Sequence, residues 1–195
     1  MHGIATKAGP ASLPNLLTYG RIAAVPAMAI AFLLLEASTG REIAFGIFIA
    51  ASLTDWLDGY LARRWQQQST LGRMLDPIAD KLLVGITLLL LVHDGTVGGN
   101  LIWAALIILS REILVSGLRE FLAELNVKVH VSRLAKWKTS LQMIALAVLL
   151  AGPAAEHVLP GLSQLGAILL WVAALLTLWT GGGYLREAIR SALHR

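Results

Sequence analysis

Four aspartates lie close together in an otherwise apolar chain, in "DWLDGYLARRWQQQSTLGRMLDPIAD", residues 55–80. Asp55 and Asp58 are three residues apart, and Asp76 and Asp80 are four apart, so each pair shares one face of a helix. Close carboxylates repel one another and are costly to desolvate, and divalent cations relieve both penalties. Ligands that are all oxygen favour Mg²⁺, Mn²⁺ or Ca²⁺ over zinc. The spacing therefore predicts that all four aspartates bind two divalent ions, of the kind that clamp a transferring phosphoryl group.

The residues between the two aspartate pairs suit a phosphorylated ligand. Gly59, Ala62 and Gly72 are small and allow a flat ring or a phosphate to approach the backbone. Arg63 offers a planar fork of donors for a diphosphate. An alternative is that the aspartates are surface charges, solvated or paired with nearby arginines and Lys81.

Asp76 has a further alternative, because Pro77 follows it. Asp76 caps the N-terminus of a helix if that helix begins here, with Pro77 in the first turn. If the helix begins earlier, Pro77 lies inside it and kinks it. Both geometries are compatible with metal binding by Asp76.

The composition indicates an integral membrane protein. Of the 195 residues, 56% are hydrophobic and 14% are charged, whereas soluble domains average roughly 45–50% and about 25%. The absence of cysteine excludes disulfides and thiolate metal sites. The net charge of +4 suits anionic headgroups or phosphorylated substrates. No nucleic-acid-binding motif is present, and we expect no nucleic-acid partner.

Six apolar stretches are long enough to cross a bilayer as helices. They lie near Leu16–Leu35, Ile43–Leu61, Leu75–Val92, Leu101–Leu122, Leu134–Ala151 and Leu162–Trp179. Turn residues separate them, as in "EASTGRE" and "HDGTVGGN", and the glycines at 181–183 are expected to end the sixth helix. The predicted fold is all-α, an integral membrane bundle of six transmembrane helices in one domain over residues 1–195, with an interfacial segment at 1–14.

The basic residues predict the orientation of this bundle. The connections after the first, third and fifth spans hold only one basic residue, Arg41, and the others lie at the termini or in the remaining connections. The positive-inside rule then places both termini in the cytosol. We expect a multi-pass protein of the cell inner (cytoplasmic) membrane, with the aspartates on the cytosolic side.

A second polar cluster surrounds the fourth and fifth spans. Arg111 and Glu112 lie inside an apolar run, where an ion pair is expensive unless it has a role. Arg119 follows Arg111 by about two turns and is expected to line the same face. These residues, together with the basic and hydroxyl side chains that open the fifth span, predict a pocket for an acceptor phosphate beside the aspartates. The predicted pocket comprises Arg111, Arg119, Lys136, Lys138 and Thr139. An alternative role for these basic residues is contact with anionic lipids.

The aspartate segment resembles the signature of the CDP-alcohol phosphatidyltransferases. Residues 55–80 read D-x2-D-G-x2-A-R-x8-G-x3-D-x3-D without a mismatch. The resemblance implies six membrane helices and two bound ions, Mg²⁺ or Mn²⁺, held by the four aspartates. It also implies that Asp80 is the general base that deprotonates the attacking alcohol. The implied residues for binding the CDP donor are Asn15, Thr18, Arg21, Gly59, Ala62, Arg63, Gly72 and Arg73. For Asn15 and Thr18, capping of a short helix after Pro14 is an equal alternative, and Arg21 could reach the membrane surface.

Two runs in the second half, "SREILVSGLRE" and "KWKTSLQ", resemble the phosphatidylglycerophosphate synthases of this family. The resemblance implies CDP-diacylglycerol as donor, sn-glycerol 3-phosphate as acceptor, a membrane lipid environment and a homodimer. Inositol phosphate, serine and phosphatidylglycerol stay open as other acceptors. A divalent-cation transporter is a further alternative, although transport sites usually lie near the bilayer midplane.

Overall fold

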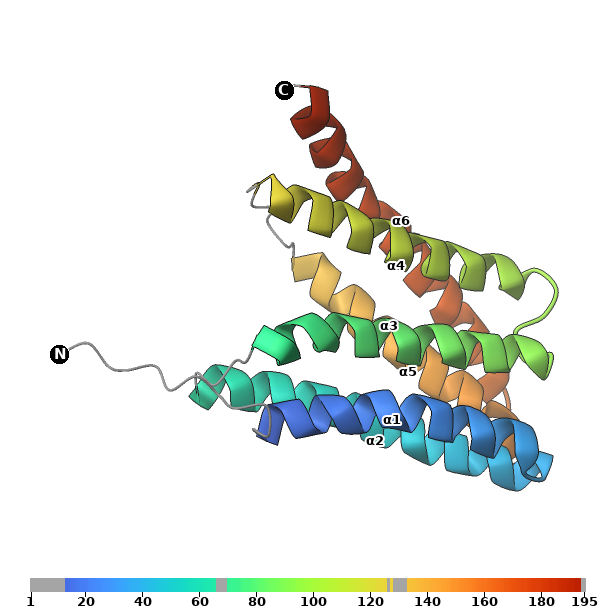
Figure 1. The fold of residues 1–195 in the computed structure, drawn as a ribbon. Coiled ribbons are helices and arrows are strands. Elements are labelled where there is room, and N and C mark those ends of the chain that lie inside the picture. Colours follow the sequence, from blue (N-terminus) through green and yellow to red (C-terminus); the bar gives the residue numbers. More distant parts are fainter. Residues whose placement is uncertain (1–12, 66–69, 126, 128–132, 194–195) are drawn as a thin grey trace. The chain divides into compact units, whose positions relative to one another are not determined.

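A computed structural model describes residues 13–65, 70–125, 127 and 133–193 of the chain. This part of the chain contains six α-helices and no strand, which confirms the all-α prediction (Figure 1). They are α1 (Leu13–Leu34), α2 (Ala37–Trp65), α3 (Thr70–His93), α4 (Leu101–Glu124), α5 (Arg133–Ala155) and α6 (Leu162–Leu193). The chain divides into two compact units, residues 1–90 and residues 91–195, which are described in turn.

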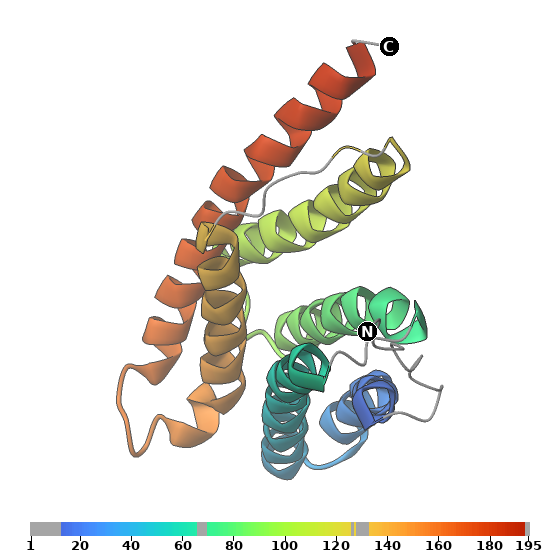
Figure 2. The ribbon, with the colours of Figure 1, turned by 90° about the vertical axis from the view of Figure 1, so that its left-hand side faces the viewer.

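Unit 1 is a bundle of α1, α2 and most of α3 (Figure 2). Its core contains Met28 of α1, Phe48 of α2, and Leu83 and Thr87 of α3, all buried. The Thr87 hydroxyl donates to the carbonyl of Leu83 at 2.7 Å, so a polar residue in an apolar core has its hydrogen bond within its own helix. The centre of unit 1 is therefore mostly apolar.

The turn between α1 and α2 is very tight. The amide of Gly40 donates to the carbonyl of Glu36 at 2.7 Å, and a Cβ at Gly40 would lie 2.5 Å from the carbonyl oxygen of Ala31. One turn of α2 therefore packs directly against the α1 backbone at a position that only glycine fits. Arg41 is buried beside this contact, with its guanidinium 5.6 Å from the Phe32 ring centroid.

Gly40→Ala is therefore expected to lower the free energy of unfolding by about 1–3 kcal/mol, because the added methyl overlaps a backbone atom that cannot move aside. Gly46→Ala is the matched control, since Gly46 lies in the same helix and no described atom comes within 4 Å of its Cβ position. That control is expected to be neutral or stabilising by up to about 1 kcal/mol. Thermal unfolding of the purified protein in detergent measures both changes, and equal midpoints for the two variants would contradict the steric explanation.

One expectation for the first half of the chain was wrong, and one open alternative is decided by the structure. The segment "EASTGRE" was predicted as a turn, but α2 already begins at Ala37, so only Leu35 and Glu36 connect it to α1. Of the two geometries left open for Asp76, the structure has the second, because α3 already begins at Thr70 and Pro77 lies inside the helix. Tight packing of α2 on α1 at Gly40 favours the early start of α2 despite its polar sequence.

Unit 2 is organised around the long helix α6, which packs against both α4 and α5 (Figure 2). Its core includes Ile108 of α4, Leu146 and Leu149 of α5, and Leu170 of α6. Glu156 stabilises the turn from α5 to α6. Its carboxylate accepts hydrogen bonds from the Gly161 amide, the Ser163 amide and the Ser163 hydroxyl, and thereby satisfies amide donors at the start of α6.

The glycines at 181–183 do not end α6, which contradicts the sequence prediction. The helix continues through them to Leu193. Tyr184 and Ala188, beyond the glycines, are 8% and 3% exposed. Tertiary packing of this last part of the helix outweighs the entropic cost of three glycines, about 1 kcal/mol each relative to alanine.

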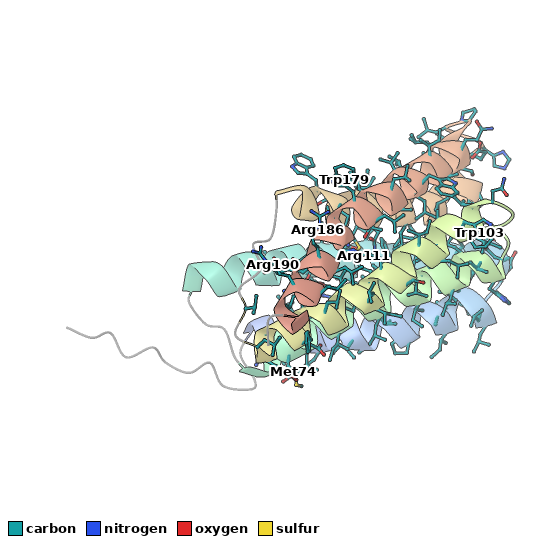
Figure 3. All side chains as sticks on the ribbon, turned by 90° about the horizontal axis from the view of Figure 1, so that it is seen from above. Met74, Trp103, Arg111, Trp179, Arg186 and Arg190 are labelled. Carbon is teal, nitrogen blue, oxygen red and sulfur yellow. The ribbon has the colours of Figure 1, made fainter. Side chains whose placement is uncertain are left out.

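Four of the six helices are long and apolar enough to cross a membrane. The qualifying segments are Asn15–Leu34, Leu101–Glu124, Trp137–Ala155 and Leu162–Arg190. Many large apolar side chains on these helices are exposed, which suits contact with lipid. In unit 2, Trp103 of α4 and Trp179 of α6 are 63% and 80% exposed. They lie towards opposite ends of the helices of this unit (Figure 3). Their positions match the aromatic belts found at the two membrane interfaces.

Candidate functional site

The polar centre of unit 1 is the buried guanidinium of Arg21. Its Nη1 atom lies 2.6 Å from Oδ1 of Asp55 in α2 and 2.8 Å from Oδ1 of Asp80 in α3. The Arg21 side chain is fully buried, whereas the side chains of Asp55 and Asp80 are 43% and 48% exposed. The structure thus brings together the first and the last of the four aspartates, from two different helices, and each remains accessible to solvent.

Asp76 is held by the same helix that carries Arg21. The Thr18 hydroxyl of α1 donates to Oδ1 of Asp76 at 2.7 Å. Thr18 and Asn15 are each only 1% exposed, and α1 runs without a break from Leu13. Thr18 therefore belongs to a tertiary contact between α1 and α3. The alternative of a short capped helix at Asn15 and Thr18 is wrong, because both residues lie within the long helix α1.

Several predicted donor-binding residues have a known helix but no described side chain. Gly72 is buried in α3. The other predicted donor-binding residues of α2 and α3 lie where side chains are outside the described part of the structure: Gly59, Ala62, Arg63 and Arg73. The side chain of Asp58, a predicted metal ligand, is also outside that part.

The described aspartates have the chemistry that a divalent cation requires. Within the described part of the chain, no group of three or more His, Cys, Asp or Glu side chains is arranged to hold an ion, and the side chain of Asp58 lies outside that part. Asp55 and Asp80 nevertheless place two carboxylate oxygens on one nitrogen atom, with about half of each side chain open to water. Converging, solvent-accessible carboxylates are the ligands that Mg²⁺ and Mn²⁺ prefer.

Unit 2 contains a second buried polar cluster, centred on Arg111 of α4, and Arg111 is labelled in Figure 3. Its Nε donates to the Thr177 carbonyl at 3.1 Å, and its Nη2 donates to the Thr180 hydroxyl at 3.2 Å, both on α6. Its Nη1 lies 3.3 Å from Oε1 of Glu112, and the Lys138 ammonium of α5 contacts the same carboxylate oxygen. Arg111 and Lys138 are 9% and 4% exposed. Two buried cations therefore share one carboxylate, and the cluster carries a net positive charge that favours an anionic ligand.

The remaining residues of the predicted acceptor pocket are Arg119, Lys136 and Thr139. Arg119 and Thr139 are exposed, and the side chain of Lys136 lies outside the described part. Eight residues at 100° each place the Arg111 and Arg119 side chains about 80° apart around α4, and Arg111 is buried whereas Arg119 is exposed.

The contribution of α6 to this cluster was not predicted from the sequence. Thr177 and Thr180 supply both α6 acceptors, and a Cβ at Gly181 would lie 3.3 Å from Cγ and Nε of Arg111. The available signal was a pair of threonines followed by glycine inside an apolar run. Gln142, one turn after Lys138 on α5, was also missed, and its buried Oε1 atom has no hydrogen-bond partner among the described residues.

Comparisons with known proteins cover nearly the whole chain. The sequence profile described as CDP-alcohol phosphatidyltransferase matches residues 11–179. A protein from Rickettsia bellii named CDP-diacylglycerol–glycerol-3-phosphate 3-phosphatidyltransferase is 46% identical over 175 residues, covering 90% of this chain and 94% of the relative. A protein of the same name from Cereibacter sphaeroides is 39% identical, covering 91% and 96% of the two chains.

A rice protein named cardiolipin synthase (CMP-forming) is 41% identical over 198 residues, covering 93% of this chain and 59% of the rice protein. These three relatives carry two different enzyme names, and each relative is similar to at least 90% of this chain. Because the profile covers most of the sequence and includes the aspartate signature, the chain belongs to the CDP-alcohol phosphatidyltransferase family.

Proposed function

We propose that the chain transfers the phosphatidyl group of CDP-diacylglycerol to sn-glycerol 3-phosphate, giving phosphatidylglycerophosphate and CMP. The observation that carries this proposal is the meeting of Asp55 and Asp80 on one buried guanidinium, within the family signature. The choice of acceptor is supported by the name of the Rickettsia and Cereibacter relatives, which this chain matches over nearly their full length.

In this proposal the four signature aspartates hold two divalent ions, Mg²⁺ or Mn²⁺. The ligands are Asp55, Asp58, Asp76 and Asp80. Ions bound there would neutralise the charge that develops on the donor diphosphate as it is cleaved. The solvent-accessible carboxylates of Asp55 and Asp80 support the assignment.

Asp80 is the proposed general base. A hydroxyl of the acceptor attacks the phosphorus that carries diacylglycerol, and Asp80 takes the hydroxyl proton. The bond from that phosphorus to the CMP oxygen breaks, and CMP leaves with the bonding electron pair. The contact between Arg21 and Oδ1 of Asp80 orients the carboxylate before the substrates bind.

The donor is proposed to bind along α1, α2 and α3. The residues concerned are Asn15, Thr18, Arg21, Gly59, Ala62, Arg63, Gly72 and Arg73. In the structure Thr18 contacts Asp76. Arg21 contacts Asp55 and Asp80. Their contribution to donor binding is therefore proposed to act through the carboxylates that they orient.

The acceptor phosphate is proposed to bind Arg111 and Lys138. Both cations are buried and share the single charge of Glu112, so a second anion is favourable there. The buried Oε1 of Gln142, without a partner in the described part of the chain, supports a hydroxyl-bearing ligand, because a hydroxyl would donate the missing hydrogen bond. Arg119, Lys136 and Thr139 stay in the proposal as outer residues of this pocket.

We further propose that all six helices span the inner membrane, with both termini and the aspartates on the cytosolic side. Helices α2 and α3 fall outside the four clearly apolar spans. They are also the helices that carry the signature aspartates and several basic residues at one end. In α3 the charged residues Asp76, Asp80 and Lys81 lie near that end, and an apolar stretch follows them to Val92.

A second candidate function is transfer to phosphatidylglycerol, which would make cardiolipin. The similarity to the rice cardiolipin synthase over 93% of this chain supports this second candidate. The acceptor for that reaction has no terminal phosphate, so the positive cluster around Arg111 would lack its proposed ligand.

An acceptor screen with purified protein and labelled CDP-diacylglycerol tests the proposed function. We expect labelled phosphatidylglycerophosphate and equimolar CMP with sn-glycerol 3-phosphate, and background product with phosphatidylglycerol, serine or inositol phosphate. Chelation by EDTA is expected to reduce the rate to background, and excess Mg²⁺ or Mn²⁺ is expected to restore it. Labelled cardiolipin as the main product would establish the second candidate instead.

A further inference from the structure

Arg21 occupies an unusual position, because its charge lies on the inner side of carboxylates that face solvent. The Arg21 side chain has no exposed surface, and its Nη1 contacts Oδ1 of both Asp55 and Asp80. Each aspartate side chain is about half exposed. An ion from solvent would therefore approach these carboxylates from the open side, opposite to the guanidinium.

The same contacts stabilise both the buried guanidinium and the two neighbouring carboxylates. A buried guanidinium stays protonated and needs an anionic partner. Two converging carboxylates repel each other unless a cation lies between them. Arg21 joins α1 to α2 and α3 through these contacts, so the guanidinium itself compensates the carboxylate charge at this point of unit 1.

We propose that Arg21 is the built-in counter-ion of the metal-free aspartates, and that it lowers their affinity for divalent ions by competing for the same negative charge. The negative charge of Asp55 and Asp80 attracts a divalent ion less strongly while the positive charge of Arg21 partly neutralises it. The buried guanidinium and a divalent ion on the same carboxylates also repel each other. Arg21 thereby acts as a positioning residue that sets the strength of metal binding. This inference rests on the proposed metal function of the aspartates.

The test is the affinity for Mn²⁺, measured by the electron paramagnetic resonance signal of free Mn²⁺ over detergent-solubilised protein without substrates. For Arg21→Gln, we expect Mn²⁺ to bind about tenfold more tightly than to the wild type, because a competing unit charge is removed. The thermal midpoint of this variant in EDTA is expected to fall, and saturating Mn²⁺ is expected to recover most of the loss. Unchanged or weaker Mn²⁺ binding by the variant would overturn the proposal.

Two control variants separate charge from structure. Arg21→Lys keeps a positive charge and is expected to bind Mn²⁺ within about threefold of the wild type, since the competing charge remains. Arg111→Gln removes the buried arginine of unit 2 and is expected to lower the thermal midpoint with no change in Mn²⁺ affinity. Tightening of Mn²⁺ binding by Arg111→Gln as well would show a nonspecific effect of lost charge and would count against the proposal.

Folding of Arg21→Gln itself gives a further outcome. If the variant is recovered only when Mn²⁺ is present during purification, the proposal is supported, because the ion then replaces the missing counter-ion. Failure to recover it with or without Mn²⁺ would contradict the proposal. Absence of Mn²⁺ binding by the wild type would refute the metal function itself, whereas binding by the wild type without tightening in Arg21→Gln would refute only the role of Arg21.

Discussion

Asp80→Asn is expected to lower the turnover number by about 10²–10⁴-fold, the usual contribution of a positioned general base. Asparagine keeps the size of the side chain but cannot accept the proton of the attacking hydroxyl. Binding of CDP-diacylglycerol is expected to change much less, because three signature aspartates remain to hold divalent ions. The measurements are the rate of CMP release and the affinity for the donor in the presence of Mg²⁺.

Asp94→Asn is a suitable control for this substitution. Asp94 lies in the turn between α3 and α4, where its carboxylate accepts a hydrogen bond from the Thr96 amide. The same change of carboxylate to amide there is expected to leave CMP release within about twofold, as for most surface substitutions. If Asp80→Asn turns over at a near-normal rate, the base is another group.

Arg111→Ala is expected to lower kcat/KM for sn-glycerol 3-phosphate by about 10–100-fold, with the loss mainly in KM. Hydrogen bonds to charged groups contribute about 1.5–3 kcal/mol each, and the variant removes the cation proposed to bind the acceptor phosphate. The KM for CDP-diacylglycerol is expected to stay within about threefold of the wild type. Steady-state kinetics with each substrate varied in turn provide both values.

Arg119→Ala is the matched control, because Arg119 lies on the same helix but is exposed. Its effect on the acceptor KM is expected to be several-fold smaller than that of Arg111→Ala. The contacts of Arg111 with Thr177 and Thr180 also stabilise unit 2, so the thermal midpoint should be measured alongside the kinetics. An equal rise of KM for both substrates would show that Arg111 supports the fold without a separate acceptor pocket.

The sequence predicted the helices well where a long apolar run follows clear turn residues, as in α4, which begins at Leu101 in both prediction and structure. It failed where tertiary contacts outweigh local preferences. The glycines at 181–183 continue a helix because later residues pack, and the polar start of α2 is helical because Gly40 fits against α1. Local rules contain no information on either contact.

In the candidate site, too, local sequence spacing was predictive and tertiary contacts were not foreseen. The spacing of the aspartates in sequence is enough to predict pairs on two helices. The partners of these aspartates are not predictable in that way, because Arg21 lies on a different helix, far from both Asp55 and Asp80 in sequence. Burial of Arg21 changes its interpretation from a residue near the membrane surface to the ionic centre of unit 1.

The shared carboxylate of Glu112 has a consequence for how the protein is assembled. Arg111 and Glu112 are neighbours in α4 and form an ion pair within that helix. During synthesis α4 can therefore enter the lipid phase before α5 exists, without an uncompensated charge. Lys138 arrives later and meets the same oxygen only if α5 inserts at the correct depth. A shift of α5 by one turn would separate the Lys138 ammonium from this carboxylate, so the contact favours a single register of α5 along α4.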